Sequence, residues 1–329
     1  MLFSKSVGID LGTANVLIYV KGLGIVLDEP SVVAIEAETK KCLAVGTEAK
    51  EMLGKTPGRI HAIRPLKDGV IADFEITEMM LNYFIRKLKL KGLFMRPIIL
   101  ICCPSNITSV ERNAIRDAAY RAGAKKVYIE EEPKVAAIGA GLDISKPSGS
   151  MVLDIGGGTT DVAVLSLGEI VTSASLKVAG DRLDKDLIKY LKETYKLLVG
   201  DRTAEEVKKT IGTAWRGSRN DTMEVSGRDL VTGLPHTITM SSDETETAYH
   251  DSLQEINRAC RTVLEQTPPE LSADIVTRGI VLTGGGALLH GIDQLLMNEL
   301  NVPVYVAENA LRCVAEGTGI MLESMHFRG

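Results

Sequence analysis

Two segments of the chain each place an aspartate before a turn of glycine and small polar residues. Asp10 precedes Gly12, Thr13, Ala14 and Asn15, and Asp154 precedes Gly156, Gly157, Gly158, Thr159 and Thr160. Such turns let backbone N–H groups converge on phosphate oxygens. An aspartate beside them can hold Mg²⁺, directly or through water. The pair predicts a polyphosphate clamped from both sides, with Asp10 and Asp154 holding the metal ion.

Each turn taken alone has a second interpretation, a tight turn whose aspartate caps the backbone; the matched pair favours phosphate binding. A third cluster, Gly284, Gly285 and Gly286 followed by Ala287 and Leu288, lies between an expected strand and an expected helix. Glycine at such a place permits close backbone approach to a ribose or a base. An ordinary loop explains this cluster equally well until the first two imply a nucleotide.

The two aspartate turns lie in matching hairpins. Apolar residues 7–10 and 16–20 predict strands on either side of the first turn, and residues 151–154 and 161–167 do so for the second. The two aspartates are 144 positions apart. This repeat predicts two related α/β halves. A strand at 280–282 with a helix from Ala287 echoes a strand and helix over 99–112.

Periodicity and capping signals place the other elements. Thr108 and Glu111 form a capping box for a helix ending near Gly123, and Thr203 and Glu206 form another for a helix over 204–214. Further helices are expected over 76–90, from Pro133, and over 184–198, 244–266 and 314–325, with a small β region over 223–240 and turns over 54–73. Strands and helices that alternate in this way indicate an α/β fold.

Composition excludes several classes of protein. The 329 residues, 45% of them hydrophobic and 25% charged, suit two globular domains. A net charge of −5 and 4% aromatic residues argue against a nucleic-acid-binding protein. Five cysteines without a C-x-x-C pair predict a reduced, intracellular protein. No targeting segment is recognisable, and the longest apolar run, 97–103, is too short to span a membrane.

The motifs together resemble the superfamily of actin, sugar kinases and heat-shock chaperone ATPases. Residues 9–15 look like its first phosphate motif, 153–161 like its second and 281–288 like its adenosine motif. Within this superfamily the chain is similar, over essentially its whole length, to the MreB family of bacterial actins. The segments that carry this likeness are 29–34, 64–73, 131–133 and 268–271, while 101–104 and 130–141 look most like the Mbl-type branch.

The resemblance implies an actin-like α/β fold, with two α/β domains of two subdomains each around a nucleotide cleft. The subdomains expected are IA (1–30, 75–145 and 311–329), IB (31–74), IIA (146–178 and 247–310) and IIB (179–246). ATP with Mg²⁺ would occupy the cleft.

The resemblance also implies a role for each motif residue. Thr13, Ala14 and Asn15 would line the β- and γ-phosphates, and Gly157, Gly158 and Thr159 would take the other side. Glu132 would position the attacking water with Thr159 as its helper; without the resemblance, Glu132 reads as an acid at a helix start, favoured by the helix dipole. The remaining nucleotide contacts implied are Gly180, Asp181, Glu205, Glu206, Val207, Lys208 and Gly284 to Leu288.

The function implied is a weak cytoskeletal ATPase that polymerises with itself into double protofilaments; MreB paralogues are further partners that the resemblance implies. The filaments would lie at the inner face of the cell membrane in the cytoplasm, and with membrane-bound wall-elongation proteins they would direct lateral wall synthesis and rod shape. Leu93, Phe94 and Met95, among Lys87, Lys89, Lys91 and Arg96, would form a membrane-contacting tip. The alternative for this tip is packing back onto the domain.

Two other classes of the superfamily are rivals. A metabolite kinase would need a sugar- or acid-binding constellation, and none is recognisable in the sequence. A chaperone ATPase would need a peptide-binding domain after the nucleotide domain, whereas the sequence stops at Gly329.

Overall fold

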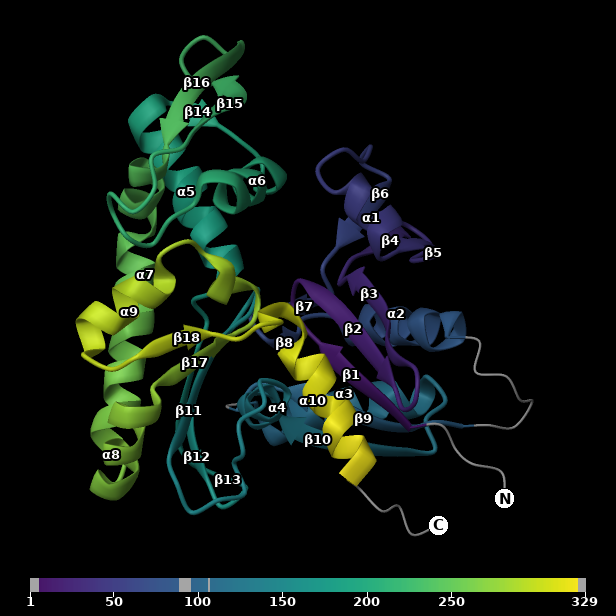
Figure 1. The fold of residues 1–329 in the computed structure, drawn as a ribbon. Coiled ribbons are helices and arrows are strands. Elements are labelled where there is room, and N and C mark those ends of the chain that lie inside the picture. The colour runs from purple at the N-terminus through teal and green to yellow at the C-terminus, as the bar shows by residue number, and fades with distance from the viewer. Residues whose placement is uncertain (1–5, 89–95, 106, 325–329) are drawn as a thin grey trace. The chain divides into compact units, whose positions relative to one another are not determined.

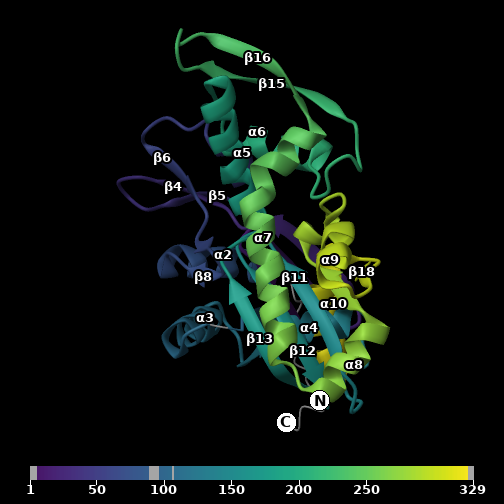
Figure 2. The same ribbon diagram turned by 90° about the vertical axis from the view of Figure 1, so that its left-hand side faces the viewer.

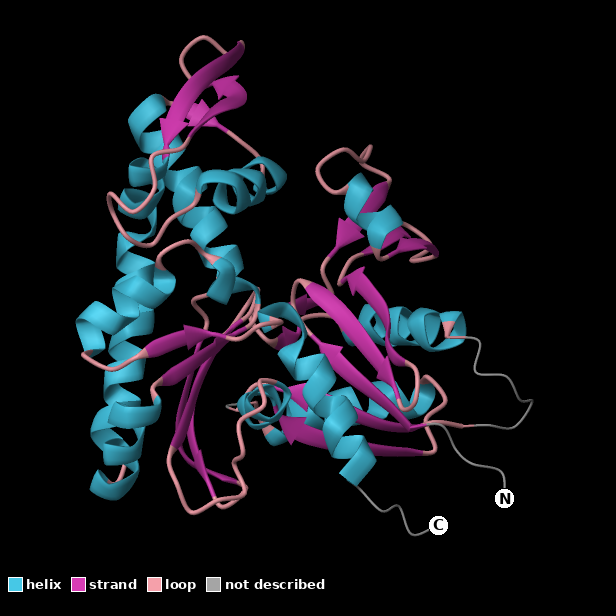
Figure 3. Ribbon diagram, in the orientation of Figure 1, coloured by secondary structure: helices cyan, strands magenta, loops and turns pink. Residues whose placement is uncertain are grey.

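The computed structural model describes residues 6–88, 96–105 and 107–324, and the chain divides into two compact units (Figure 1). Unit 1 contains residues 1–143 and 311–329, and unit 2 contains residues 144–310. In both units strands form a central sheet and helices flank it (Figure 3).

Unit 1 is built on a five-stranded sheet in the order β10-β9-β1-β2-β3. The hairpin β1–β2 is antiparallel, as is β2–β3, whereas β9 runs parallel to both β1 and β10. Apolar residues such as Ile9, Ile18 and Ile101 are fully buried in its core. The strands are β1 (Ser6–Leu11), β2 (Asn15–Val20), β3 (Gly24–Pro30), β9 (Ile98–Cys103) and β10 (Lys126–Glu131).

The other elements of unit 1 are five helices and two small sheets among the described residues. A three-stranded sheet, β5-β4-β6, and the pair β7–β8 lie in the insert after β3. The bounds are α1 (Thr47–Met52), α2 (Phe74–Lys87), α3 (Ser109–Arg121), α4 (Glu132–Gly139), α10 (Cys313–Ser324), β4 (Val33–Glu36), β5 (Cys42–Val45), β6 (Ile60–Ile63), β7 (Leu66–Lys67) and β8 (Val70–Ile71).

Glycines bring α4 and α10 into backbone contact. A Cβ on Gly139 would lie 1.7 Å from the carbonyl oxygen of Cys313, and one on Gly317 would lie 2.1 Å from that of Val135. No larger residue fits at either position without moving a helix, because real Cβ atoms never come this close to a backbone oxygen. The packing fixes α4, which begins at Glu132.

Unit 2 repeats the topology of unit 1. Its five-stranded sheet has the order β13-β12-β11-β17-β18, with β11–β12–β13 antiparallel and β17 parallel to both β11 and β18. The hairpin β11–β12 therefore corresponds to β1–β2, which confirms the internal repeat. The strands are β11 (Ser150–Ile155), β12 (Thr160–Ser166), β13 (Glu169–Leu176), β17 (Ile280–Thr283) and β18 (Val304–Val306).

Helices cover the sheet of unit 2, and a second, smaller sheet lies at one end of them. The long helix α7 packs against β12 and β13, and the hairpin β15–β16 extends beyond its first turns (Figure 2). The bounds are α5 (Gly180–Tyr195), α6 (Asp201–Ile211), α7 (Ser242–Gln266), α8 (Pro269–Arg278), the 3-10 turn η1 (Gly285–Leu288), α9 (Ile292–Leu300), β14 (Leu197–Leu198), β15 (Thr222–Asp229) and β16 (Pro235–Ser241); a further 3-10 turn, η2 (Ala310–Arg312), leads into α10.

Several sequence-based expectations were wrong in detail. The box at Thr203 and Glu206 does not form: α6 begins at Asp201 after Gly200, so Thr203 lies inside the helix. The helix expected from Ala287 is a single 3-10 turn. Helix α9 begins only after Gly291, whose φ of 74° is left-handed and therefore does not continue a right-handed helix. Helix α5 starts at Gly180 and not near 184, and the segment expected to be all turns contains β6, β7 and β8. The box at Thr108 and Glu111 is confirmed.

Candidate nucleotide-binding site

The second aspartate turn forms the hairpin β11–β12 of unit 2. The carboxylate of Asp154 is buried at the end of β11 and accepts a hydrogen bond of 2.6 Å from the hydroxyl of Thr283 on β17. Burial raises the pKa of Asp154, and the neighbouring Asp161, its partner in register on β12, raises it further. The turn closes with a 2.9 Å hydrogen bond from the Gly156 N–H to the Thr159 carbonyl.

The first turn of α5 is hydrogen-bonded to this second aspartate turn, residues 156–160, which is the candidate phosphate-binding turn and is hereafter called the phosphate turn. The N–H of Gly180 donates to the Gly156 carbonyl (3.2 Å), and the N–H of Asp181 donates to the Gly157 carbonyl (2.8 Å). The structure therefore brings Gly180 and Asp181, two of the expected nucleotide contacts, to the second aspartate turn. Helix periodicity predicts a helix that starts near residue 184, whereas α5 starts at Gly180. Periodicity alone therefore did not place Gly180 and Asp181 in its first turn.

The third glycine cluster packs directly on the end of β11. Gly284 has a φ of +80°, and a Cβ there would lie 2.4 Å from the Ile155 carbonyl oxygen. A Cβ on Gly286 would lie 2.2 Å from the Ile155 side chain. Both positions need glycine, the first for its left-handed conformation as well. The side chain of Leu288 is exposed, whereas Ala287 is buried.

Helix α6 brings one cation to the same place. The ammonium of Lys208 donates to the Gly180 carbonyl (2.8 Å) and pairs with Asp184 on α5 (2.8 Å). Glu205 pairs with Lys209 (2.5 Å). Of the four α6 residues expected at the nucleotide, Val207 points its side chain into the hydrophobic core and Glu206 is exposed.

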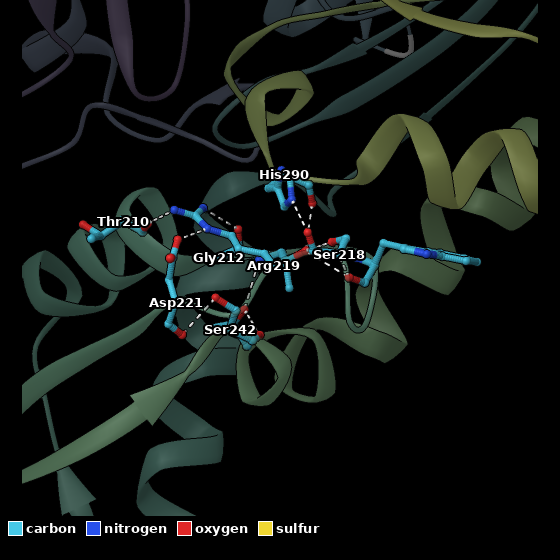
Figure 4. A network of polar contacts seen from close by, with 10 residues as sticks. Thr210, Gly212, Ser218, Arg219, Asp221, Ser242 and His290 are labelled. Carbon is cyan, nitrogen blue, oxygen red and sulfur yellow. Dashed lines mark hydrogen bonds and ion pairs between the residues drawn. The ribbon is translucent and has the colours of Figure 1, made fainter.

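A polar network fixes the C-terminal end of α6 (Figure 4). Arg219 donates to the carbonyls of Thr210 (2.5 Å) and Gly212 (3.5 Å) and pairs with Asp221 (2.5 Å). The ring Nε2 of His290, in the loop after η1, contacts the Ser218 carbonyl at 3.2 Å. Sequence reasoning missed this network because most of its contacts are to backbone carbonyls, which leave no residue pattern, and His290 is 72 positions from Ser218.

The buried hydroxyl of Thr213 completes the link between α6 and the loop after η1. It contacts the His290 carbonyl (3.2 Å), and the Ala214 N–H donates to the same carbonyl (2.7 Å). Helix α6 and the turn η1 are therefore joined through residues of unit 2 alone.

The first aspartate turn is held by residues that the motif does not include. The hydroxyl of Ser31 donates to the Gly12 carbonyl (2.5 Å), and its N–H donates to the Ala14 carbonyl (2.9 Å). The Gly69 N–H donates to the Thr13 hydroxyl (3.2 Å). The Asn15 amide donates to Asp28 (3.0 Å).

Asp10 and Glu132 lie at the carboxyl ends of β1 and β10, the two strands of unit 1 that flank β9. Asp10 pairs in register with Cys102 on β9, and Glu132 directly follows β10. Burial raises the pKa of the Cys102 thiol, and the charges of Asp10 and then Glu132 raise it further. In the sheet Cys102 lies between Asp10 on β1 and Glu130 on β10, and Glu132 follows Glu130 by two residues. Unit 1 therefore brings to one edge of its sheet the two residues that the resemblance assigned to metal and water.

Some expected features fall elsewhere. Leu93, Phe94 and Met95 lie outside the described residues, while Lys87 at the end of α2 pairs with Glu29 (2.5 Å).

Within the described ranges no helix is long and apolar enough to cross a membrane. The same ranges hold no group of three or more His, Cys, Asp or Glu side chains suited to a metal ion. A Mg²⁺ bound by one or two carboxylates and by phosphate oxygens needs no such group.

Relatives and solved structures resemble the chain over nearly its full length. It is 64% identical to the cell shape-determining protein Mbl of Bacillus cereus (98% of this chain, 97% of the relative) and 53% identical to the cell shape-determining protein MreB of Escherichia coli (100% and 96%). The ADP-bound crystal structure of MreB5 of Spiroplasma citri matches with a TM-score of 0.93 at 43% identity (97% and 96%), and its AMPPNP-bound structure with 0.94 at 42% (98% and 97%).

The likeness to MreB5 confirms the expected actin-like α/β fold. The family model for MreB/Mbl proteins matches residues 4–328, and the high identity to the Bacillus protein supports the Mbl-type branch. On these grounds the chain belongs to the MreB/Mbl family of bacterial actin-like proteins.

Proposed function

We propose that this chain is a nucleotide-dependent, filament-forming protein that determines cell shape by directing lateral wall synthesis. The observation that carries the proposal is the convergence at the end of β11, where the phosphate turn, the first turn of α5, Lys208 and the Gly284–Gly286 cluster all meet. The cell-shape role comes from the names of the Mbl and MreB relatives.

The nucleotide is ATP, bound through the residues of both aspartate turns. MreB5, a family member, has been solved with ADP and with AMPPNP. The donor set fits Mg²⁺, because Asp154 presents a buried carboxylate whose ionised form needs a nearby cation. Asp10 and Asp154 would hold the ion, directly or through water, and the ion would neutralise phosphate charge.

The expected enzyme activity is slow hydrolysis of ATP to ADP and phosphate, coupled to assembly. Phosphoryl transfer depends on positioning and charge neutralisation. Glu132 orients the water and Thr159 assists it. The position of Glu132 at the start of α4, held by the glycine contacts with α10, supports a fixed carboxylate at that point.

The chain assembles with itself into double protofilaments, and paralogues of the same family are further partners. A solved structure of MamK, which is 20% identical, is a double helical filament; at this identity it supports only the shared fold. The filaments lie at the inner face of the cell membrane, where Leu93, Phe94 and Met95 provide contact and wall-elongation proteins are bound.

The nucleotide proposal is tested by Asp154→Asn. We expect this variant to lose affinity for Mg²⁺-AMPPNP at least about tenfold in equilibrium binding, since it removes a charged ligand of the metal. Asp251→Asn, an exposed aspartate on α7, is the control and should bind as wild type. Unchanged affinity in Asp154→Asn would overturn the assignment of the site.

A further inference from the structure

Lys208 and Asp184 form an ion pair that is largely withdrawn from water. Their side chains are only 16% and 11% exposed, and the ammonium lies 2.8 Å from the carboxylate. Most ion pairs on a protein surface contribute little because water screens them. This pair lies between α5 and α6, where the two helices pack against each other.

The same ammonium reaches the backbone of the first turn of α5. It donates to the Gly180 carbonyl at 2.8 Å, while the Gly180 N–H donates to the Gly156 carbonyl of the phosphate turn. A Cβ on Gly180 would lie 3.4 Å from the Lys208 ammonium and 3.4 Å from the Gly156 oxygen, so the three groups are in close contact. Lys208 thus connects α6 to the turn that carries the phosphate-binding residues.

An ammonium has three N–H donors. The Gly180 carbonyl accepts one of them, and the Asp184 carboxylate lies 2.8 Å from the nitrogen as an ion-pair partner; both groups lie on α5. With both partners on one helix, the flexible lysine stem is held in one conformation. N–H capacity of the ammonium remains for an acceptor on a bound molecule, and the Lys208 side chain is 16% exposed.

We propose that Asp184 is a positioning residue for nucleotide binding: through their ion pair it holds Lys208 so that an N–H of the ammonium is directed at the bound nucleotide. The proposal deepens the proposed function and rests on it. Asp184 itself touches no nucleotide, because its side chain is buried between the helices. Its effect on binding therefore passes through Lys208, and a prepared cation lowers the entropy cost of binding.

The charges around the Lys208–Asp184 pair indicate that variants lacking one or both of its charges should still fold. Burial raises the pKa of Asp184, Lys208 lowers it, and Asp181 and Glu205 raise it. Without Lys208 the carboxyl can take up a proton and remain buried at little cost, so a Lys208→Met variant should fold. Removal of both charges is tolerated even better, because buried ion pairs are often replaceable by neutral groups.

The test is a double-mutant cycle on the full chain. Equilibrium dissociation constants for Mg²⁺-AMPPNP are measured for wild type, Asp184→Asn, Lys208→Met and the double variant. We expect Asp184→Asn and Lys208→Met each to weaken binding about tenfold or more, the size of one charge-assisted hydrogen bond. The double variant should bind as Lys208→Met does, because Asp184 has nothing to position once the cation is gone.

Asp186→Asn is the matched control. Asp186 lies on the same helix but pairs with Arg182 and Ser252. Wild-type affinity in this variant supports the proposal, and an equal loss of affinity in Asp184→Asn and Asp186→Asn overturns it. The proposal is also overturned if the effects of Asp184→Asn and Lys208→Met multiply, or if Lys208→Met and the double variant differ in affinity. Lys208→Met can be compared with the double variant even if Asp184→Asn alone does not fold. Failure of the wild-type protein to bind nucleotide would instead overturn the proposed function itself.

Discussion

At the scale of single residues, glycine decides how closely the chain packs around the end of β11. Gly284 and Gly286 allow the loop before α9 to lie against Ile155, next to the buried Asp154. Any side chain at Gly284 would meet both strain and a backbone oxygen. A Cβ on Gly284 would lie 3.0 Å from Asp154 Oδ1, so glycine leaves room for the buried carboxylate. Burial is the largest cause of the raised pKa of Asp154.

Glu132 should act on hydrolysis and not on affinity. In Glu132→Gln the amide has the shape of the carboxylate but cannot accept a proton from water. We expect the affinity for AMPPNP to stay within about twofold, while phosphate release at saturating ATP falls roughly 10²–10⁴-fold. Glu131→Gln, its neighbour at the helix N-cap, is the control. If affinity collapses while turnover per bound ATP is unchanged, Glu132 has a structural role.

At the scale of elements, α5 and α7 are tied together where one ends and the other begins. Glu244 completes a capping box with Ser241 at the start of α7, and it accepts hydrogen bonds from Tyr195 and Tyr190 on α5. Burial opposes the ionised carboxylate, but these hydrogen bonds, that of Tyr195 first, outweigh it and lower the pKa of Glu244. The contact stabilises the end of α5 that is remote from the phosphate turn.

This contact predicts a pH-dependent stability. Because the pKa of Glu244 is lower in the folded protein than its ordinary 4.5, the unfolded chain binds the proton more tightly, and the contribution is full above about pH 4.5 and lost as the pH falls through the lowered value. Glu244→Gln should lower the free energy of unfolding by about 1 kcal/mol at pH 7. Thermal unfolding from pH 7 to 3 should show this difference shrinking, and a difference independent of pH would contradict it.

At the scale of the whole molecule, the two units are versions of one design. Each has an antiparallel hairpin with an aspartate at the end of its first strand, a third antiparallel strand, and two parallel strands on the other side. In both units the candidate aspartate lies toward the carboxyl end of a strand that has a parallel neighbour, the usual place for ligand sites in open α/β sheets. The units differ mainly in their inserts, β4–β6 with α1 in one and α6 with β14–β16 in the other.

Assembly and membrane attachment should depend on each other. Replacing Leu93, Phe94 and Met95 by serine is expected to release the protein from anionic liposomes in flotation while AMPPNP binding persists. Each large apolar side chain contributes about 1.5–3 kcal/mol when it leaves water, so a monomer binds weakly and a filament with many copies binds firmly. The comparison is a variant in which serine replaces Leu2 and Phe3, two apolar residues near the start of the sequence that could add a second, weaker membrane contact. Undiminished flotation would move the anchor elsewhere, and lost AMPPNP binding would make the segment part of the fold.

The sequence alone was sufficient for the fold class and the internal repeat. Asp10 and Asp154 stand out as candidates because local turns are specified by neighbouring glycines and hydroxyl residues, and the repeat makes each turn support the other. The capping box at Thr108 and Glu111 was predictable for the same reason, since both partners lie within one helical turn.

Only the tertiary structure revealed what holds these motifs in place. The box expected at Thr203 does not form because α6 begins at Asp201, two residues earlier, and packs Ala204 and Val207 into the core. Ser31 at the first turn, Thr283 at Asp154 and Asp184 at Lys208 are distant in sequence from the groups that they hold. Contacts of this kind leave no spacing in the chain, because they arise when strands and helices from separate segments pack together.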